Sequence, residues 1–145
     1  MIPIKVLFLC IHNSARSQMA EAFLKEYGGA MYHAESAGLE AGRLNPLAVE
    51  AMNEVGMDIS RNKTKNVFDL RQQGRIYDYV ITVCDEASAA RCPVFAGRHI
   101  KLNWGFPDPS QFSGTAQERL EQTRQVRGQI KDAVNKFILD TRIKE

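Results

Sequence analysis

Short apolar segments alternate along this chain with longer segments of helical periodicity, and this alternation limits the possible folds more than any other feature. Runs rich in Val, Ile, Leu and aromatic residues have the length of buried strands and span residues 4–9, 31–36, 79–83 and 99–102. Strands separated by helices are typical of parallel sheets that are covered on both faces. We therefore predict an α/β fold with a parallel sheet and helices on both of its faces.

The segments between the strands carry helix start and stop signals. Residues 19–27 form one apolar stripe that ends at a pair of glycines, and Asn45 is followed by a proline, as at many helix N-termini. Thr115 and Glu118 have the spacing of a capping box that opens a long C-terminal helix. The pattern of residues 63–75 indicates neither a helix nor a strand clearly.

Bulk properties exclude several classes of protein. The length of 145 residues fits one domain, spanning residues 1–145, and a net charge of +2 gives no broad attraction to nucleic acid or to an anionic membrane. The apolar run at the N-terminus is too short for a signal peptide, and no stretch is long enough to span a bilayer. We expect a cytoplasmic monomer without nucleic-acid or membrane partners.

The chain has three cysteines. Thiols stay reduced in the cytoplasm, so an odd number of them points to catalysis, redox cycling or simple burial rather than to a disulfide framework. Cys10 and Cys84 each follow a predicted strand, and ligands of such sheets bind beyond the carboxyl ends of the strands.

The first predicted strand leads into a Cys, five residues, an Arg and a Ser, and then into a helix. Such a loop can surround a tetrahedral oxyanion with backbone N–H groups and a helix N-terminus, while Arg16 binds two of its oxygens. The same positive field would stabilise a thiolate at Cys10, and the Ser17 hydroxyl can donate a hydrogen bond to the sulfur. The candidate substrate-binding residues are Ile11, His12, Asn13, Ser14, Ala15 and Arg16. Alternatively, Cys10 is a buried core residue beside an N-capping Ser, which is the commoner role of a lone cysteine.

Residues 10–22 resemble the phosphate-binding loop and first helix of the low-molecular-weight protein tyrosine phosphatase superfamily. Within them, residues 16–21 resemble the thioredoxin-coupled arsenate reductases. Further matches occur in the same order along the chain, at Ser36-Ala37-Gly38, Asn45-Pro46, Asp58-Ile59-Ser60, Val83-Cys84-Asp85, Cys92-Pro93, Trp104-Gly105-Phe106 and Asp108-Pro109. The resemblance implies one four-stranded parallel sheet flanked by helices.

The other two cysteines distinguish a reductase from a phosphatase. A phosphatase needs one thiol and water, whereas a reductase supplies two electrons and so needs a second thiol that forms a disulfide. The segment between Cys84 and Cys92 is small and polar and could refold when its ends are joined. Two unrelated buried cysteines are the plainer alternative. A zinc site is disfavoured, because there is no C-x-x-C pair and the three histidines are not spaced as ligands.

Asp108 precedes a proline and matches the acidic loop of the family, where a general acid can protonate the departing oxygen. The same residues also suit a plain turn. Ser110 and Gln111 follow, in place of the aromatic residues usual in the tyrosine phosphatases, which favours a small inorganic substrate.

The resemblance implies a relay in which Cys10 attacks arsenate, Cys84 attacks the Cys10 adduct and Cys92 then attacks Cys84. Arsenate is the expected substrate, with phosphate or sulfate as analogues. Thioredoxin would reduce the final disulfide, and no tightly bound cofactor is expected. The alternatives are a phosphatase of the same superfamily and a non-catalytic module that binds oxyanions or senses redox state.

Some reductases of this family hold a potassium ion. Asn13, Glu21 and Ser36 match three of its ligand positions, and the fourth, acidic position falls near Lys65 and Asn66. A lysine ammonium can replace a monovalent cation by offering one positive charge to the same oxygens. We therefore expect little dependence on potassium.

Overall fold

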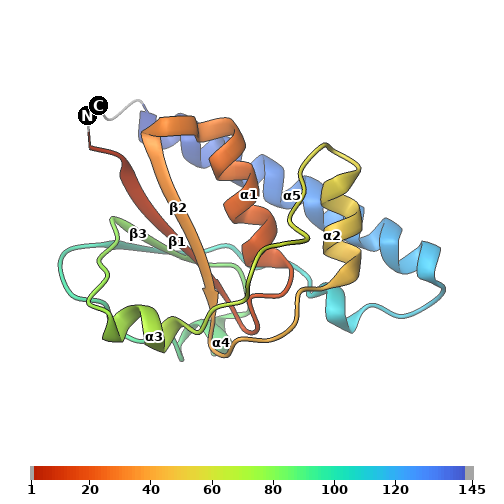
Figure 1. The fold of residues 1–145 in the computed structure, drawn as a ribbon, viewed down its shortest axis with the longest axis horizontal. Helices are drawn as coiled ribbons and strands as arrows, with labels where there is room; N and C mark the ends of the chain where they lie inside the picture. Colours follow the sequence, from red (N-terminus) through yellow and green to blue (C-terminus); the bar gives the residue numbers. More distant parts are fainter. Residues whose placement is uncertain (1, 143–145) are drawn as a thin grey trace.

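The sheet contains four parallel strands in the order β2-β1-β3-β4 (Figure 1). The computed structural model describes residues 2–142. The strands are β1 (Ile4–Cys10), β2 (Tyr32–Gly38), β3 (Tyr79–Thr82) and β4 (Ile100–Asn103). The predicted parallel sheet is confirmed, and the predicted strand boundaries differ from the observed ones by at most two residues.

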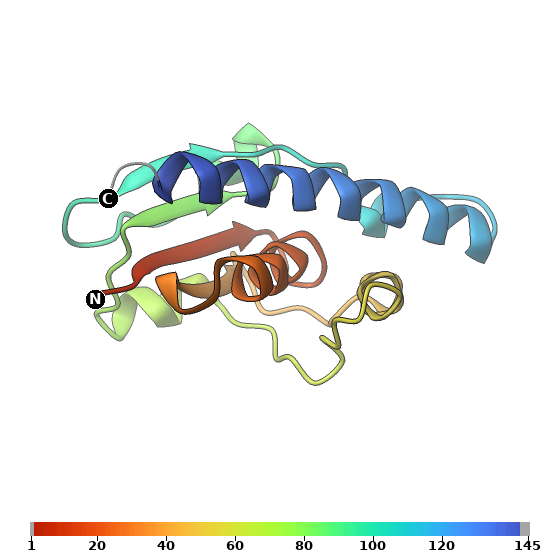
Figure 2. The same ribbon diagram turned by 90° about the horizontal axis from the view of Figure 1, so that it is seen from above.

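Helices lie on both faces of this sheet, as predicted (Figures 1 and 2). They are α1 (Arg16–Gly28), α2 (Pro46–Asn53), α3 (Val67–Gln72), α4 (Glu86–Ala89) and α5 (Ala116–Arg142), with short 3₁₀ turns η1 (Gly29–Met31) and η2 (Pro109–Gln111). Helices α1 and α5 pack side by side across one face, and α2 contacts both of them.

Strand β1 lies in the middle of the molecule and contributes to two cores. Val6 and Phe8 point to the face that α1 and α5 cover, where Phe23 and Ile130 are among the buried residues. The intervening Leu7 and Leu9 point to the opposite face and pack with Val67 and Leu70 of α3. Because a strand segment buried on both faces needs apolar residues throughout, residues 6–10 of β1 form a continuous apolar run.

The helix ends follow the capping signals of the sequence. The Asn45 side chain accepts a hydrogen bond of 2.8 Å from the Leu47 N–H, and Thr115 and Glu118 bond to each other's backbone N–H groups at 3.1 and 3.2 Å. Helix α3, which the sequence did not predict, has six residues, and that is too short to establish a helical period. Tyr27 is also an exception, because it is 42% exposed at the end of the expected apolar stripe.

The order of the strands brings the ends of β1 and β3 together. The two strands are parallel neighbours, and the Val83 N–H donates to the Leu9 carbonyl at 2.8 Å. The residues that follow at this edge of the sheet are Cys10 and Cys84. Within residues 2–142, no helix has both the length and the apolar character needed to cross a bilayer.

Candidate active site

The loop between β1 and α1 is held by its carbonyl groups, which point outward. The carbonyls of Cys10, Ile11, His12 and Ser14 accept hydrogen bonds of 2.9–3.1 Å from the backbone N–H groups of residues 39–45. A trans peptide points its N–H away from its carbonyl, so the N–H groups of the next residues turn toward the centre of the loop. The loop therefore forms a ring of donors suited to an oxyanion.

The Cys10 sulfur lies among these inward donors. It accepts a hydrogen bond of 3.1 Å from the Asn13 N–H, and its Sγ is 2.9 Å from the Ser17 hydroxyl. The Ser17 oxygen accepts from the Asn13 side-chain amide at 2.8 Å, which leaves the Ser17 proton for the sulfur. The Asn13 N–H and the Ser17 hydroxyl are therefore both positioned to donate to this sulfur.

Asn13 determines the shape of the loop and is itself held from outside it. It adopts a φ of 56°, a left-handed conformation that Asn tolerates better than most residues do. Its side-chain oxygen accepts from the Gln18 amide at 3.1 Å and from the Lys65 N–H at 3.0 Å. Gln18 also bonds to Asn62 and to the Lys63 carbonyl. The sequence analysis did not single out Gln18, although it lies within the segment that carries the resemblance.

Two glycines allow the segment that follows β2 to approach the loop closely. A Cβ atom on Gly38 would lie 2.7 Å from the Asn13 nitrogen, and one on Gly42 would lie 2.8 Å from the His12 Cβ. These approaches bring residues 39–45 within reach of the loop carbonyls. The His12 ring lies 2.9 Å from the Glu40 carboxylate, so its side chain is directed away from the loop. Ala15 is buried in the core beneath.

Arg16 connects the loop to the two segments that follow β3 and β4. One guanidinium nitrogen donates to the Phe106 carbonyl at 3.2 Å, and the other is 3.3 Å from the Asp108 carboxylate. The Asp108 side chain also caps the turn η2 by accepting from the Ser110 N–H. Arg16 and Asp108 line a cavity of about 510 Å³ with Ile11, Asp85, Gly105, Phe106 and Gln111. This cavity gives an anion a path to Arg16.

Cys84 is buried directly after β3 and is 1% exposed. Burial raises the pKa of its thiol to about 11, although the nearby Arg16 guanidinium opposes this shift. The charges of Cys10 and Asp85 raise the pKa further. In the reduced protein the Cys84 thiol therefore keeps its proton at neutral pH, next to the sulfur of the oxyanion loop.

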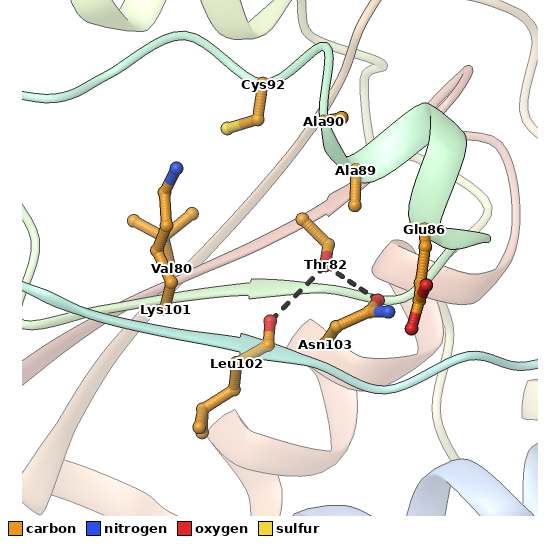
Figure 3. A pocket seen from close by; sticks show the side chains of 9 residues that line it. All are labelled: Val80, Thr82, Glu86, Ala89, Ala90, Cys92, Lys101, Leu102 and Asn103. Carbon is orange, nitrogen blue, oxygen red and sulfur yellow. Dashed lines mark hydrogen bonds between the residues drawn. The ribbon is translucent and has the colours of Figure 1, made fainter.

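Cys92 is separated from this centre by the short helix α4. It lies on the wall of a cavity of about 310 Å³ and packs against the core on the α3 side of the sheet, whereas Cys10 belongs to the core on the α1 side (Figure 3). Its thiol donates to the Pro93 carbonyl at 3.4 Å, and burial raises its pKa. All three cysteines are free thiols. The structure thus brings Cys10, Arg16, Ser17, Cys84 and Asp108 together and leaves Cys92 apart.

The three residues expected near a monovalent cation already make hydrogen bonds to other protein groups. Glu21 accepts from the Ser36 hydroxyl at 2.6 Å and from the Lys25 ammonium at 2.6 Å. The lysine that reaches this group is therefore Lys25, one turn further along α1, whereas Lys65 contributes its backbone N–H to Asn13. The sequence analysis did not consider Lys25 for this role. Within residues 2–142, no cluster of three or more His, Cys, Asp or Glu side chains is arranged to hold a metal ion.

Comparison with known proteins agrees with this geometry. Residues 5–145 match the family model of the low molecular weight phosphotyrosine protein phosphatases. The arsenate reductase of Shouchella clausii is 42% identical over 132 residues, which cover 91% of this chain and 93% of the relative.

Two solved structures extend the comparison. An arsenate reductase in its oxidized state has a TM-score of 0.79 and 36% identity, covering 94% of this chain and 97% of its own. A thioredoxin-dependent arsenate reductase of Corynebacterium glutamicum has a TM-score of 0.64 and 33% identity, covering 95% of this chain and 64% of its own. This chain therefore belongs to the low molecular weight phosphotyrosine protein phosphatase family, among the arsenate reductases within it.

Proposed function

We propose that this protein reduces arsenate to arsenite through Cys10, Cys84 and Cys92 and is returned to its reduced form by thioredoxin. The observation that carries the proposal is the position of Cys84, a second buried thiol at the end of the strand beside the oxyanion loop. Hydrolysis of a phosphate ester needs no such thiol, whereas a two-electron reduction does. The named arsenate reductases among the relatives support the same reading.

The first step joins sulfur to arsenic. Arsenate enters the loop, where the inward N–H groups and Arg16 bind its oxygens, and this displaces Asp108 as the partner of Arg16. The Cys10 thiolate attacks arsenic and an arsenate oxygen leaves as water, with Asp108 as the proton donor. The product is a covalent Cys10–arsenic(V) adduct, and no electrons have yet been transferred to the substrate.

The second step transfers the electrons. The Cys84 sulfur attacks Cys10 Sγ, a disulfide forms, and the electron pair of the sulfur–arsenic bond stays on arsenic, which leaves as arsenite. The order Cys10 and then Cys84 follows from position, because Cys10 opens the oxyanion loop that would bind arsenate, whereas Cys84 follows the neighbouring strand, outside that loop.

The third step moves the disulfide to the surface. The Cys92 thiolate attacks Cys84, a Cys84–Cys92 bond forms and Cys10 leaves as a thiolate. The small, exposed helix α4 would have to unfold for this exchange. Thioredoxin then reduces the disulfide, as the Corynebacterium glutamicum relative named for thioredoxin suggests. We place the reaction in the cytoplasm, where the donor is available.

Arsenite release with one cysteine replaced at a time tests this proposal. Cys84→Ser should release no arsenite, whereas Cys92→Ser should release one arsenite per protein and accumulate a Cys10–Cys84 disulfide that peptide mapping identifies. Wild-type protein oxidised by arsenate without a reductant should carry Cys84–Cys92 and a free Cys10. Sustained turnover of Cys92→Ser with thioredoxin would contradict the assigned order.

The same assay separates the alternatives. A phosphatase would hydrolyse aryl phosphates well and release no arsenite, and a non-catalytic module would do neither. The shared anion loop should give the reductase a weak hydrolysis of small aryl phosphates that requires Cys10 and Arg16. Loss of that hydrolysis in Cys84→Ser would contradict the proposal that Cys84 acts only in the reduction.

A further inference from the structure

The cavity beside Cys92 contains a positive charge that the mechanism above does not use. Apolar walls come from Val80 of β3, Leu102 of β4, and Ala89 and Ala90 at the end of α4. Figure 3 shows the Lys101 side chain extending from β4 toward the Cys92 thiol. The charged side chains among the lining residues are Glu86 and Lys101.

The other elements packed near Cys92 bring little further charge to it. Helix α3 contributes Arg71, whose guanidinium donates to the Val94 carbonyl at 2.8 Å, two residues beyond Cys92. The core on this face is otherwise apolar, with Leu70 and Phe95 among its members. Burial raises the pKa of Cys92, and Lys101 is the charged group that opposes this shift. Glu86 lines the same cavity.

We propose that Lys101 is a positioning residue that stabilises the thiolate of Cys92 in the cavity between α4 and β4 and so prepares it to attack Cys84. The proposal rests on the proposed function, in which Cys92 performs that attack. Thiol exchange proceeds through the thiolate, so the fraction of Cys92 that is ionised sets the rate of the exchange until the thiol is fully deprotonated.

The exchange step is balanced without any further reactant. Cys92 loses its proton to solvent, its thiolate attacks Cys84 Sγ, the Cys84–Cys92 bond forms and the Cys10–Cys84 bond breaks with Cys10 as the leaving thiolate. Lys101 neither accepts the proton nor contacts the substrate. It acts only by stabilising the negative charge of the Cys92 thiolate. This stabilisation is moderate because the Lys101 side chain is exposed to solvent.

The test is the pH dependence of Cys92 alkylation in the reduced, folded protein, read by peptide mass spectrometry after short exposure to iodoacetamide. Lys101→Met should move the Cys92 midpoint up by about half to one pH unit, so that alkylation at pH 7 slows roughly three- to tenfold. Lys101→Arg should behave as wild type because it keeps the charge. Lys136→Met is the matched control, since it removes the same charge from an exposed position on α5.

High salt should move the wild-type profile toward that of Lys101→Met, because screening weakens the same interaction. The conversion of Cys10–Cys84 to Cys84–Cys92 after one arsenate turnover should also be slower in Lys101→Met at pH 7 and equal to wild type at high pH. Superimposed Cys92 profiles for wild type and Lys101→Met, or an equal shift in Lys136→Met, would overturn the proposal. If wild type released no arsenite, the proposed function would fail, while the alkylation profiles would still decide the role of Lys101.

Discussion

The oxyanion loop and the segment from Asp85 to Cys92 lie at the ends of neighbouring strands but are held in opposite ways. The loop bonds through its carbonyls to residues 39–45 and through Asn13 to Gln18 and Lys65. In the second segment, the hydrogen bonds among the described residues join its own members or the next residue, as in the Asp85 cap that accepts from the Ser88 N–H and hydroxyl. Its helix α4 buries none of its residues.

This difference corresponds to two requirements of the proposed relay. A ring of donors stabilises a developing charge only if it is already in place before the reaction, and tertiary contacts provide that order. A cysteine that must travel to Cys84 needs a segment that can unfold without disturbing the sheet, and local bonds are sufficient for such a segment. The contrast predicts that similar substitutions in the two regions have unequal effects.

Replacing one small polar side chain in each region tests the contrast most strongly. Asn13→Ala removes three side-chain hydrogen bonds and places Ala at a positive φ, so we expect the free energy of unfolding to fall by about 2–4 kcal/mol. Ser88→Ala removes one hydroxyl bond to the Asp85 cap and should cost less than about 1 kcal/mol. Urea unfolding of both variants measures the difference, and phosphate should protect Cys10 from alkylation only in Ser88→Ala. Equal losses of stability would show that the two regions are anchored alike.

The buried thiol of Cys84 should have a smaller effect on stability, confined to alkaline pH. Its pKa is raised from 9.0 to about 11, so the folded protein keeps a proton that the unfolded chain has lost. The resulting stabilisation is complete below pH 9 and is lost as the pH rises toward 11.

Between pH 9 and 11, the free energy of unfolding should therefore fall by about 2 kcal/mol more in wild type than in Cys84→Ala. Urea denaturation of both proteins at several pH values, with a reductant present, gives this difference. Parallel pH dependences would mean that the Cys84 thiol is not protected from ionisation by burial.

The smallest effect on stability is expected from exchanging the monovalent cation near Glu21 of α1. The Glu21 oxygens already bond to Ser36 and Lys25, so exchanging potassium for sodium should change the melting temperature by less than about 1 °C. Lys25→Met removes the ammonium group that pairs with Glu21 and should make the melting temperature respond more to potassium. Thermal melts of both proteins in matched chloride salts provide the measurement. A large response of wild type to potassium would show that the Lys25 ammonium does not replace the ion.

Much of the fold could be predicted because its signals are local. The apolar runs gave the strands to within two residues, and the Asn45 and Thr115 caps were identified from residues adjacent to each helix start. Helix α3 could not be predicted, since its six residues include only two that are buried. The exposure of Tyr27 could not be predicted either. Tyr27 lies at the end of the apolar stripe, which extends beyond the core that the stripe was expected to join.

The oxyanion loop could also be predicted from the sequence alone, because residues 10–17 are contiguous and their chemistry depends on their order. Only the tertiary structure decided what surrounds that loop. The distant Lys65 supplies a donor to Asn13, Lys25 rather than Lys65 neutralises Glu21, and Cys92 lies across the sheet from Cys10 beside Lys101. Such contacts join residues that are far apart along the chain, and their geometry is set by how the sheet and helices pack rather than by any local pattern.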